Sequence, residues 1–218
     1  MTLSQRFVGA YAPRSRSHLR QAATLGPRAL EGLALYAALE TTSSGIHSYA
    51  DIVRQNDDDA KNKGEPGLRG QCHCVRHVLS YSATQFVSAV VVTRALGYRV
   101  PLYILLFGTA LNGGTHYIID RRQPLWNFLR SRWARKLRFV GNGKAAYAEF
   151  AVVQRSNGVV DKAGPGTAIM DIDQAVHRAI SVFASLTMAW LTLRWASLLT
   201  PLSNGSATRA HNHAARVG

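Results

Sequence analysis

Long apolar segments separated by polar connections dominate the pattern of this chain. Three segments are about as long as the ~20 residues with which a helix crosses a bilayer: 78–96, 100–119 and 179–200. The only Asp, Glu, Lys or Arg residues inside them are Arg94 and Arg194. This pattern favours membrane-spanning helices over the alternative, in which the same segments are the buried helices of a soluble protein.

A fourth segment, residues 29–50, gives a weaker membrane signal. Glu31 and Glu40 lie within it, and residues 41–45 are small and polar. It fits a polar inner helix of a bundle or a helix in the membrane interface, and we count it as a membrane helix. The sequence therefore predicts an all-α polytopic membrane helix bundle with about four transmembrane helices.

Turn and breaker residues set the expected boundaries. The predicted helices cover residues 28–56, 72–96, 101–120 and 171–200. Between the first two we expect a polar hinge, because Gly64, Pro66, Gly67 and Gly70 interrupt any helix there.

The remaining segments are basic or low in apolar residues. The connection 121–170 contains an aromatic and basic stretch, 125–139, which is typical of a short interfacial helix. The predicted domain organisation is a basic flexible N-terminal arm (1–27), a membrane helix-bundle domain (28–200) and a disordered C-terminal tail (201–218).

The net charge of +14 has two possible meanings. Clustered basic residues neutralise nucleic-acid phosphates, or they flank membrane helices on the cytoplasmic side. No zinc-finger spacing, RNA-binding strand motif or heptad pattern accompanies the charge, so we expect membrane lipid as partner, other membrane proteins as further candidates, and no specific nucleic acid. Cys72 and Cys74 are too few for a disulfide framework and are interpreted as incidental thiols.

Histidine and aspartate recur in pairs at the ends of the apolar segments. Three pairs have four-residue spacing, which places both side chains on one helix face: His47/Asp51, His116/Asp120 and Asp173/His177. His77 stands near the start of another apolar segment. Because consecutive helices of an up-and-down bundle alternate in direction, we expect all these ends on one side of the membrane. The basic connection makes that side cytoplasmic, although the arginines of the N-terminal arm favour the opposite orientation.

Imidazole and carboxylate groups together suit zinc and other first-row divalent ions. The predicted metal ligands are His47, His77, His116, Asp120, Asp173 and His177. The predicted catalytic carboxylates are Asp51, Asp120 and Asp173. Two alternatives remain open: these groups only hydrogen-bond the helices together, or they form a proton relay.

Polar and aromatic neighbours complete the expected site. Gln55 and Gln174 are expected to hydrogen-bond to the cluster, since amides bind metals poorly. Nearby cations either neutralise an anionic substrate such as a phosphate or, as we favour, anchor to lipid head groups: Lys61 or Lys63, Arg121 and Arg122. An aromatic interface belt is expected from Tyr49, Tyr81, Tyr117, Trp126 and Trp133.

The order of these residues resembles a known family. The set is His47-x-x-x-Asp51-x-x-x-Gln55, then Lys61 or Lys63, then His77, then His116-x-x-x-Asp120, then Asp173-Gln174-x-x-His177. It is similar to a bacterial, mainly actinobacterial, family of small polytopic membrane proteins, the domain of unknown function 3307, over about residues 45–195. The family has no established activity, so the resemblance implies a membrane bundle with a shared polar site but supplies no reaction.

Together these features predict a small integral membrane protein with a cytoplasm-facing His/Asp cluster that acts as a metal-dependent hydrolase at the membrane surface. The expected cofactor is a divalent metal, with zinc as the first candidate. The alternative is a non-enzymatic accessory or exclusion factor of a mobile element, which acts through partner membrane proteins. A third interpretation, a soluble nucleic-acid binder, needs the apolar segments to be core helices.

Overall fold

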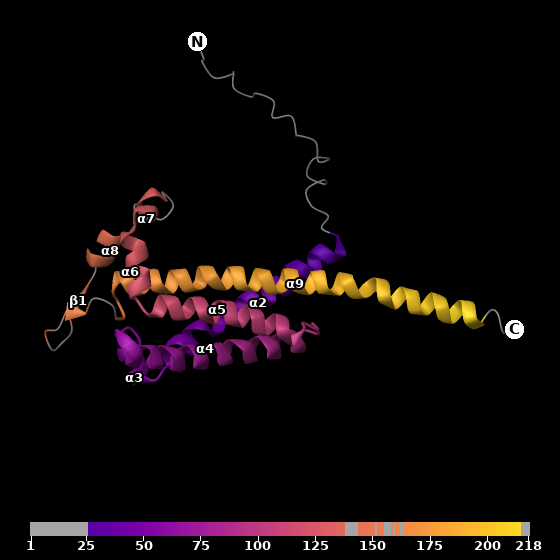
Figure 1. Ribbon diagram of the computed structural model, residues 1–218, viewed down its shortest axis with the longest axis horizontal. Coiled ribbons are helices and arrows are strands. Elements are labelled where there is room, and N and C mark those ends of the chain that lie inside the picture. The colour runs from indigo at the N-terminus through magenta and orange to yellow at the C-terminus, as the bar shows by residue number, and fades with distance from the viewer. Residues whose placement is uncertain are drawn as a thin grey trace, which may run out of the picture.

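Four long helices pack together, and the last of them continues well past the other three (Figure 1). The computed structural model describes residues 26–137, 144–150, 152–154, 158, 160–161 and 164–214, with side chains as far as residue 196. The long helices are α2 (Pro27–Ser48), α4 (Gly67–Ala95), α5 (Leu102–Asp120) and α9 (Ala168–Ala214). In this part of the chain the only strands are the antiparallel pair β1 (Val153–Gln154) and β2 (Val160–Asp161), so the predicted all-α class is confirmed.

The long helices form a ring in which each packs against two others. α2 contacts α4 and α9, and α5 contacts the same two helices. An apolar core fills one half of this bundle, with its buried centre formed by Leu35, Leu39, Ile104, Leu105 and Met188. This core fixes the helices relative to one another and leaves the other half of the bundle interior to polar side chains.

Short elements gather at one end of the bundle (Figure 1). They are the π-helical turn η1 (Tyr49–Val53), α3 (Asp57–Asn62), α6 (Gln123–Arg130), α7 (Arg132–Lys136) and α8 (Ala145–Phe150). A second apolar cluster packs α6 and α8 onto α5 and α9 and includes Ile119, Leu125, Leu129, Ala148 and Ile169. The ends of four long helices are thereby enclosed at this end, where the candidate site lies.

Several helix boundaries differ from the predicted ones. The first helix ends in η1 at Val53 rather than at 56, and the expected hinge contains α3. Asn56 caps α3 by accepting a hydrogen bond from the Asp58 backbone N–H, and three aspartates in the first turn complement the helix dipole. α4 begins at Gly67 rather than 72, and the interfacial helix is split into α6 and α7.

The domain boundaries are only partly open to comparison with the structure. The predicted N-terminal arm lies, up to residue 25, outside the described residues. α9 continues to Ala214, past the predicted helix end at 200 and into the segment expected to be a disordered tail. The bundle domain, by contrast, has both of its apolar clusters within residues 35–189.

The outer surface of the long helices is apolar to an unusual degree. More than half of the side-chain surface is exposed at Leu79, Val87, Val91, Leu106, Phe107, Phe183, Leu186 and Trp190. Among the described helices, however, only the segment 168–196 of α9 is long and apolar enough by its average composition to cross a membrane. That measure does not support the predicted four transmembrane helices.

Candidate metal centre

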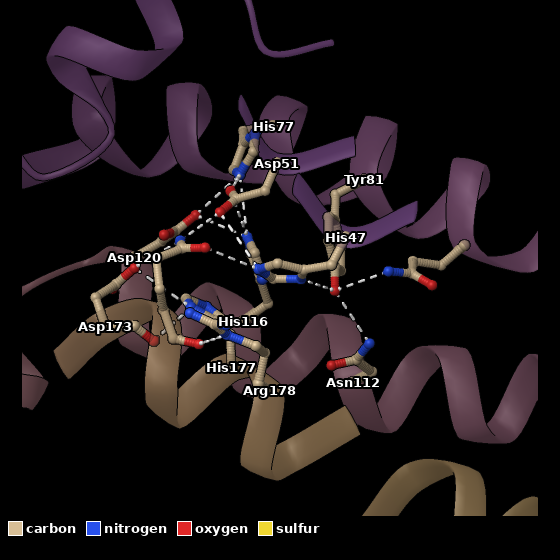
Figure 2. Close-up of polar contacts among 12 residues, drawn as sticks. His47, Asp51, His77, Tyr81, Asn112, His116, Asp120, Asp173, His177 and Arg178 are labelled. Carbon is tan, nitrogen blue, oxygen red and sulfur yellow. Dashed lines mark hydrogen bonds and ion pairs between the residues drawn. The ribbon is translucent and has the colours of Figure 1, made fainter. Parts of the chain in front are cut away.

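Side chains from five helical elements converge inside the capped end of the bundle (Figure 2). α2 supplies His47, η1 supplies Asp51 and α4 supplies His77. α5 supplies His116 and Asp120, and α9 supplies Asp173 and His177. All seven are less than one-tenth exposed. The alternation of helix directions thus brings the predicted residues together.

Four of these residues present one ligand atom each to a common point. His77 Nε2 lies 3.0 Å from His116 Nε2 and 3.1 Å from both Asp51 Oδ1 and Asp120 Oδ2. His116 Nε2 lies 3.3 Å from the same Asp51 oxygen and 3.2 Å from the same Asp120 oxygen. The buried set Asp51, His77, His116 and Asp120, called here the ligand quartet, could hold a metal ion.

The spacing of the ligand quartet matches tetrahedral coordination. Ligands about 2.0 Å from a tetrahedral ion are about 3.3 Å apart, close to the separations of 3.0–3.3 Å found here. By hydrogen bonding alone, one of two facing imidazole Nε2 atoms must carry a proton, and it cannot serve the other ring and two carboxylates equally. A cation at the centre accepts a lone pair from all four atoms at once.

Lys63 adds a positive charge beside the quartet. Its ammonium group donates to Asp120 Oδ2 at 3.0 Å and lies 3.9 Å from Asp51 Oδ1. With neutral imidazoles, the carboxylates of Asp51, Asp120 and Asp173 carry three negative charges. The Lys63 ammonium balances one of them, so two remain unbalanced. Buried charge is costly unless it is compensated, and a divalent cation supplies the missing charge.

The Asp51 carboxylate is held in its ionised form. Burial opposes ionisation, but hydrogen bonds from His116 and His77 and the charge of Lys63 outweigh it, so the pKa of Asp51 lies far below its usual range. An ionised carboxylate is the form that binds metals. Asp51, predicted as a catalytic carboxylate, is therefore placed here among the candidate metal ligands.

A second group shares one carboxylate with the quartet. Asp120, Asp173 and His177 also offer ligand atoms within 4.8 Å of one another. His177 Nδ1 lies 2.9 Å from the Asp173 carbonyl oxygen and 3.3 Å from its carboxylate. His177 Nε2 is buried without a hydrogen-bond partner among the described residues. This group resembles a partial coordination sphere that extends the quartet toward α9.

His47 differs from its predicted role as a metal ligand. Its Nδ1 lies 3.0 Å from the Tyr81 hydroxyl and its Nε2 lies 3.1 Å from Gln174 Oε1. Both ring nitrogens therefore already have partners. His47 belongs to neither candidate ligand group. It links α2 to α4 and α9 behind the quartet.

Both predicted glutamine contacts are present. Gln174 donates to Asp51 Oδ2 at 2.7 Å. The other oxygen of this carboxylate, Oδ1, belongs to the quartet, so the hydrogen bond fixes the orientation of the whole group. With its amide turned, Gln55 donates to the Asp51 carbonyl at 3.0 Å and accepts from the Lys63 ammonium at 3.1 Å. Of the two predicted lysines, Lys63 is the one at the site, and Lys61 is exposed.

Tyr81 is the main participant that sequence reasoning misplaced. It was expected in an interface belt, yet it is 1% exposed and accepts hydrogen bonds from Gln85 and Asn112. The sequence contains a signal for this. Gln85 lies four residues after Tyr81, and Asn112 lies four residues before His116, so each pair places polar groups on one face of its helix. These faces mark the polar half of the bundle interior.

A cleft of about 250 Å³ opens onto the cluster. Asp51, Asp120 and Asp173 line it together with Lys63 and Arg122. Its apolar wall is formed by Ile52, Leu125, Pro165, Ile169 and Met170. Molecules at this end of the bundle can therefore reach the carboxylate side of the quartet.

The other histidine of α4 belongs to a separate contact. His73 Nδ1 lies 2.7 Å from Asp59 Oδ1, and Arg76 donates to the same oxygen. Cys72 is exposed and Cys74 is buried, and neither belongs to a candidate ligand group within the described residues. The interpretation of the cysteines as incidental thiols agrees with this placement.

No family model, curated protein or solved structure matches this chain. The resemblance to an uncharacterised family of membrane proteins accordingly stays a prediction from the ordered residues.

Proposed function

We propose that this protein is a membrane-embedded hydrolase with one divalent metal ion held by the ligand quartet. The observation that carries the proposal is that two imidazole nitrogens lie 3.0 Å from each other and 3.1–3.3 Å from two carboxylate oxygens, beside an open cleft. Zinc is the first candidate, because it binds nitrogen and oxygen ligands in this geometry. A metal-bound water with its pKa lowered to about 7 would supply the nucleophile.

The protein's own residues have distinct roles in this proposal. Lys63 offsets the charge of Asp120, and Gln174 orients Asp51 through its second oxygen. Asp173 lines the cleft and lies 3.3 Å from His177 Nδ1, so this pair can take a proton from an attacking water. Water would approach the ion from the cleft side, which Asp51, Asp120 and Asp173 line.

The membrane part of the proposal comes from the distribution of side chains. Polar residues such as Gln85, Asn112 and His116 are buried, whereas apolar residues such as Val87 and Leu106 are exposed on the same helices. Average composition counts both faces of a helix, so inward polar residues mask an apolar outer face. Large exposed apolar surfaces mark contact with a membrane or a partner. We infer that α2, α4, α5 and α9 all lie in the bilayer.

The orientation follows from the short elements at the capped end. They carry many cationic side chains: Arg121, Arg122, Arg130, Arg132, Arg135, Lys136 and Lys144. Positive charge next to membrane helices favours the cytoplasmic side. The centre would then face the inner leaflet, where lipid-linked molecules can reach the cleft.

Metal content tests the central claim. Full-length protein purified in detergent should retain about one equivalent of zinc or another first-row metal by elemental analysis, and His77→Ala should lose it. His73→Ala is the matched control, because this buried histidine on the same helix contacts Asp59 instead of the quartet. A wild-type chain without metal after growth with each candidate metal would contradict the proposal. The non-enzymatic membrane factor would then be the remaining alternative.

Fractionation tests the membrane claim separately. The chain should stay with membranes through alkaline carbonate washing and enter solution only with detergent. Recovery in the salt-soluble fraction would contradict it, and would return the apolar segments to the role of core helices in a soluble protein.

A further inference from the structure

We propose that the cleft binds a phosphate ester, and that Arg122 is the residue that recognises the phosphate. This inference rests on the proposed function, because it assigns the substrate class of the same site. Arg122 lines the cleft together with the carboxylates of Asp51, Asp120 and Asp173. Its guanidinium group has no hydrogen-bond or ion-pair partner among the residues that the structure describes.

The other two cations near the cluster are already engaged. Lys63 donates to Asp120 at 3.0 Å. Arg121 donates to the carbonyl oxygens of Lys63 and Glu65, at 2.7 and 2.6 Å, and so fixes the loop that carries Lys63. Only Arg122 therefore has its full set of guanidinium donors available to an incoming anion among these three residues.

The backbone holds Arg122 in an uncommon conformation. Its φ of 55° lies in the left-handed region, which residues with a side chain rarely adopt, and surrounding packing must maintain it. The side chain passes over Gly64, where an added Cβ would lie 3.0 Å from Arg122 Cδ and 3.4 Å from Nε. Because Gly64 has no side chain, the Arg122 side chain has room to pass over it.

The charge of the cleft makes anion binding depend on the metal. Four carboxylates, including Asp57, and two cations line it, so two negative charges stay unbalanced until a divalent ion binds. With the metal present, the ion and Arg122 offer two positive centres to one anion. A phosphate has several acceptor oxygens, which suits one oxygen on a metal and others on the planar donors of a guanidinium.

The remaining wall of the cleft is apolar. Ile52, Leu125, Ile169 and Met170 contribute to it. Such a surface fits the organic part of the ester, and the same chemistry is offered by a lipid phosphomonoester or by a soluble one. In the hydrolysis, the water oxygen would bond to phosphorus as the ester P–O bond breaks. The leaving alcohol would take one proton of the water, and the other would stay with the phosphate.

Titration of inorganic phosphate tests the inference. Calorimetry would use the full chain in detergent, loaded with the divalent metal that the purified protein retains, with metal content measured on the same sample. We expect binding by the metal-loaded chain, and affinity reduced about 10- to 100-fold in Arg122→Gln, because charge-assisted hydrogen bonds are lost. Arg122→Lys should recover part of the affinity. Arg135→Gln, which removes an exposed arginine outside the cleft, should bind as the wild type does.

The outcomes separate this inference from the proposed function. A metal-loaded chain whose phosphate affinity is unchanged in Arg122→Gln would overturn the inference alone. A chain that holds no metal would overturn the proposed function and this inference with it. Competition between inorganic phosphate and micelles that contain phosphatidic acid distinguishes the sources: displacement supports a lipid ester, and its absence with intact phosphate binding supports a soluble ester.

Discussion

Tyr81 stacks on His116 with ring centroids 4.0 Å apart and an angle of 19° between the ring planes. Its hydroxyl lies 3.0 Å from His47 Nδ1 and accepts hydrogen bonds from Gln85 and Asn112. One side chain thus supports a quartet imidazole with its ring and ties together three helices with its hydroxyl. This places Tyr81 as the positioning residue for the buried face of the cluster.

Replacement of Tyr81 by Phe should separate these two contributions. The ring stack remains, but three buried polar groups lose a partner, which should lower the free energy of unfolding by about 1–3 kcal/mol. Thermal denaturation in detergent would measure the loss. Tyr103→Phe serves as the control, because half of the Tyr103 side chain is exposed and its hydroxyl should matter little. Equal melting temperatures for both variants would show that the hydroxyl network contributes no stability.

Removal of the Lys63 charge should raise the affinity of the quartet for metal. The ammonium group lies 3.0 Å from Asp120 and 3.9 Å from Asp51, so it repels a cation bound between those carboxylates. In Lys63→Met we expect metal affinity at least about tenfold higher by competition with a fluorescent chelator. Lys61→Met removes an exposed charge two residues away and should leave the affinity unchanged. Weaker binding in Lys63→Met would place the metal elsewhere.

The repeated four-residue spacing explains how much of the site could be predicted. Each His/Asp pair lies on one helix face, and helices of alternating direction bring their paired ends together at the capped end of the bundle. The spacing contains no information about the rotation of each helix about its axis. His47 was therefore expected to bind metal but turns toward Tyr81 and Gln174.

Features that depend on tertiary contacts were beyond sequence reasoning. The π-helical turn η1 carries Asp51 into the quartet, and nothing in the local sequence marks the extra residue in that turn. The loop at Lys63 was expected to be part of a hinge, yet α3 and the contacts of Arg121 fix it against α5. In the second case a residue distant in sequence, Arg121, fixes the local conformation.

Acid should weaken the contact that joins α3 to α4. Burial of Asp59 opposes its ionisation, but hydrogen bonds from Arg76 and His73 outweigh this and lower its pKa below the usual 3.8. Because the folded pKa is lower than the unfolded one, the stabilisation is complete above about pH 4 and disappears as pH falls through the folded pKa. Asp59→Asn should therefore be less stable than the wild type near pH 7, with the difference becoming smaller as the pH falls below 3.8.

Denaturation of both proteins between pH 2 and 7 would measure this difference. Asp58→Asn is the control, since the Asp58 side chain is 62% exposed and lies 3.6 Å from His73 and 4.0 Å from Arg76. Its stability should follow the wild type more closely at every pH. A constant difference between Asp59→Asn and the wild type over the whole range would rule out ionisation of Asp59 as the cause.

A methyl group at Gly70 should displace the loop that carries Lys63. An added Cβ would overlap the carbonyl oxygen of Glu65 and would lie 2.7 Å from Arg121 Nη1, so the backbone itself must shift. Such overpacking costs about 1–3 kcal/mol, and here it also breaks the Arg121 contacts that position the loop. Gly114→Ala is the matched control in α5, where no atom lies within 4 Å of the added carbon and the change should stabilise the helix slightly. We expect Gly70→Ala to lower both the melting temperature and the affinity for inorganic phosphate, with Gly114→Ala lowering neither. A stable Gly70→Ala protein with normal phosphate affinity would show that the loop position does not matter for the cleft.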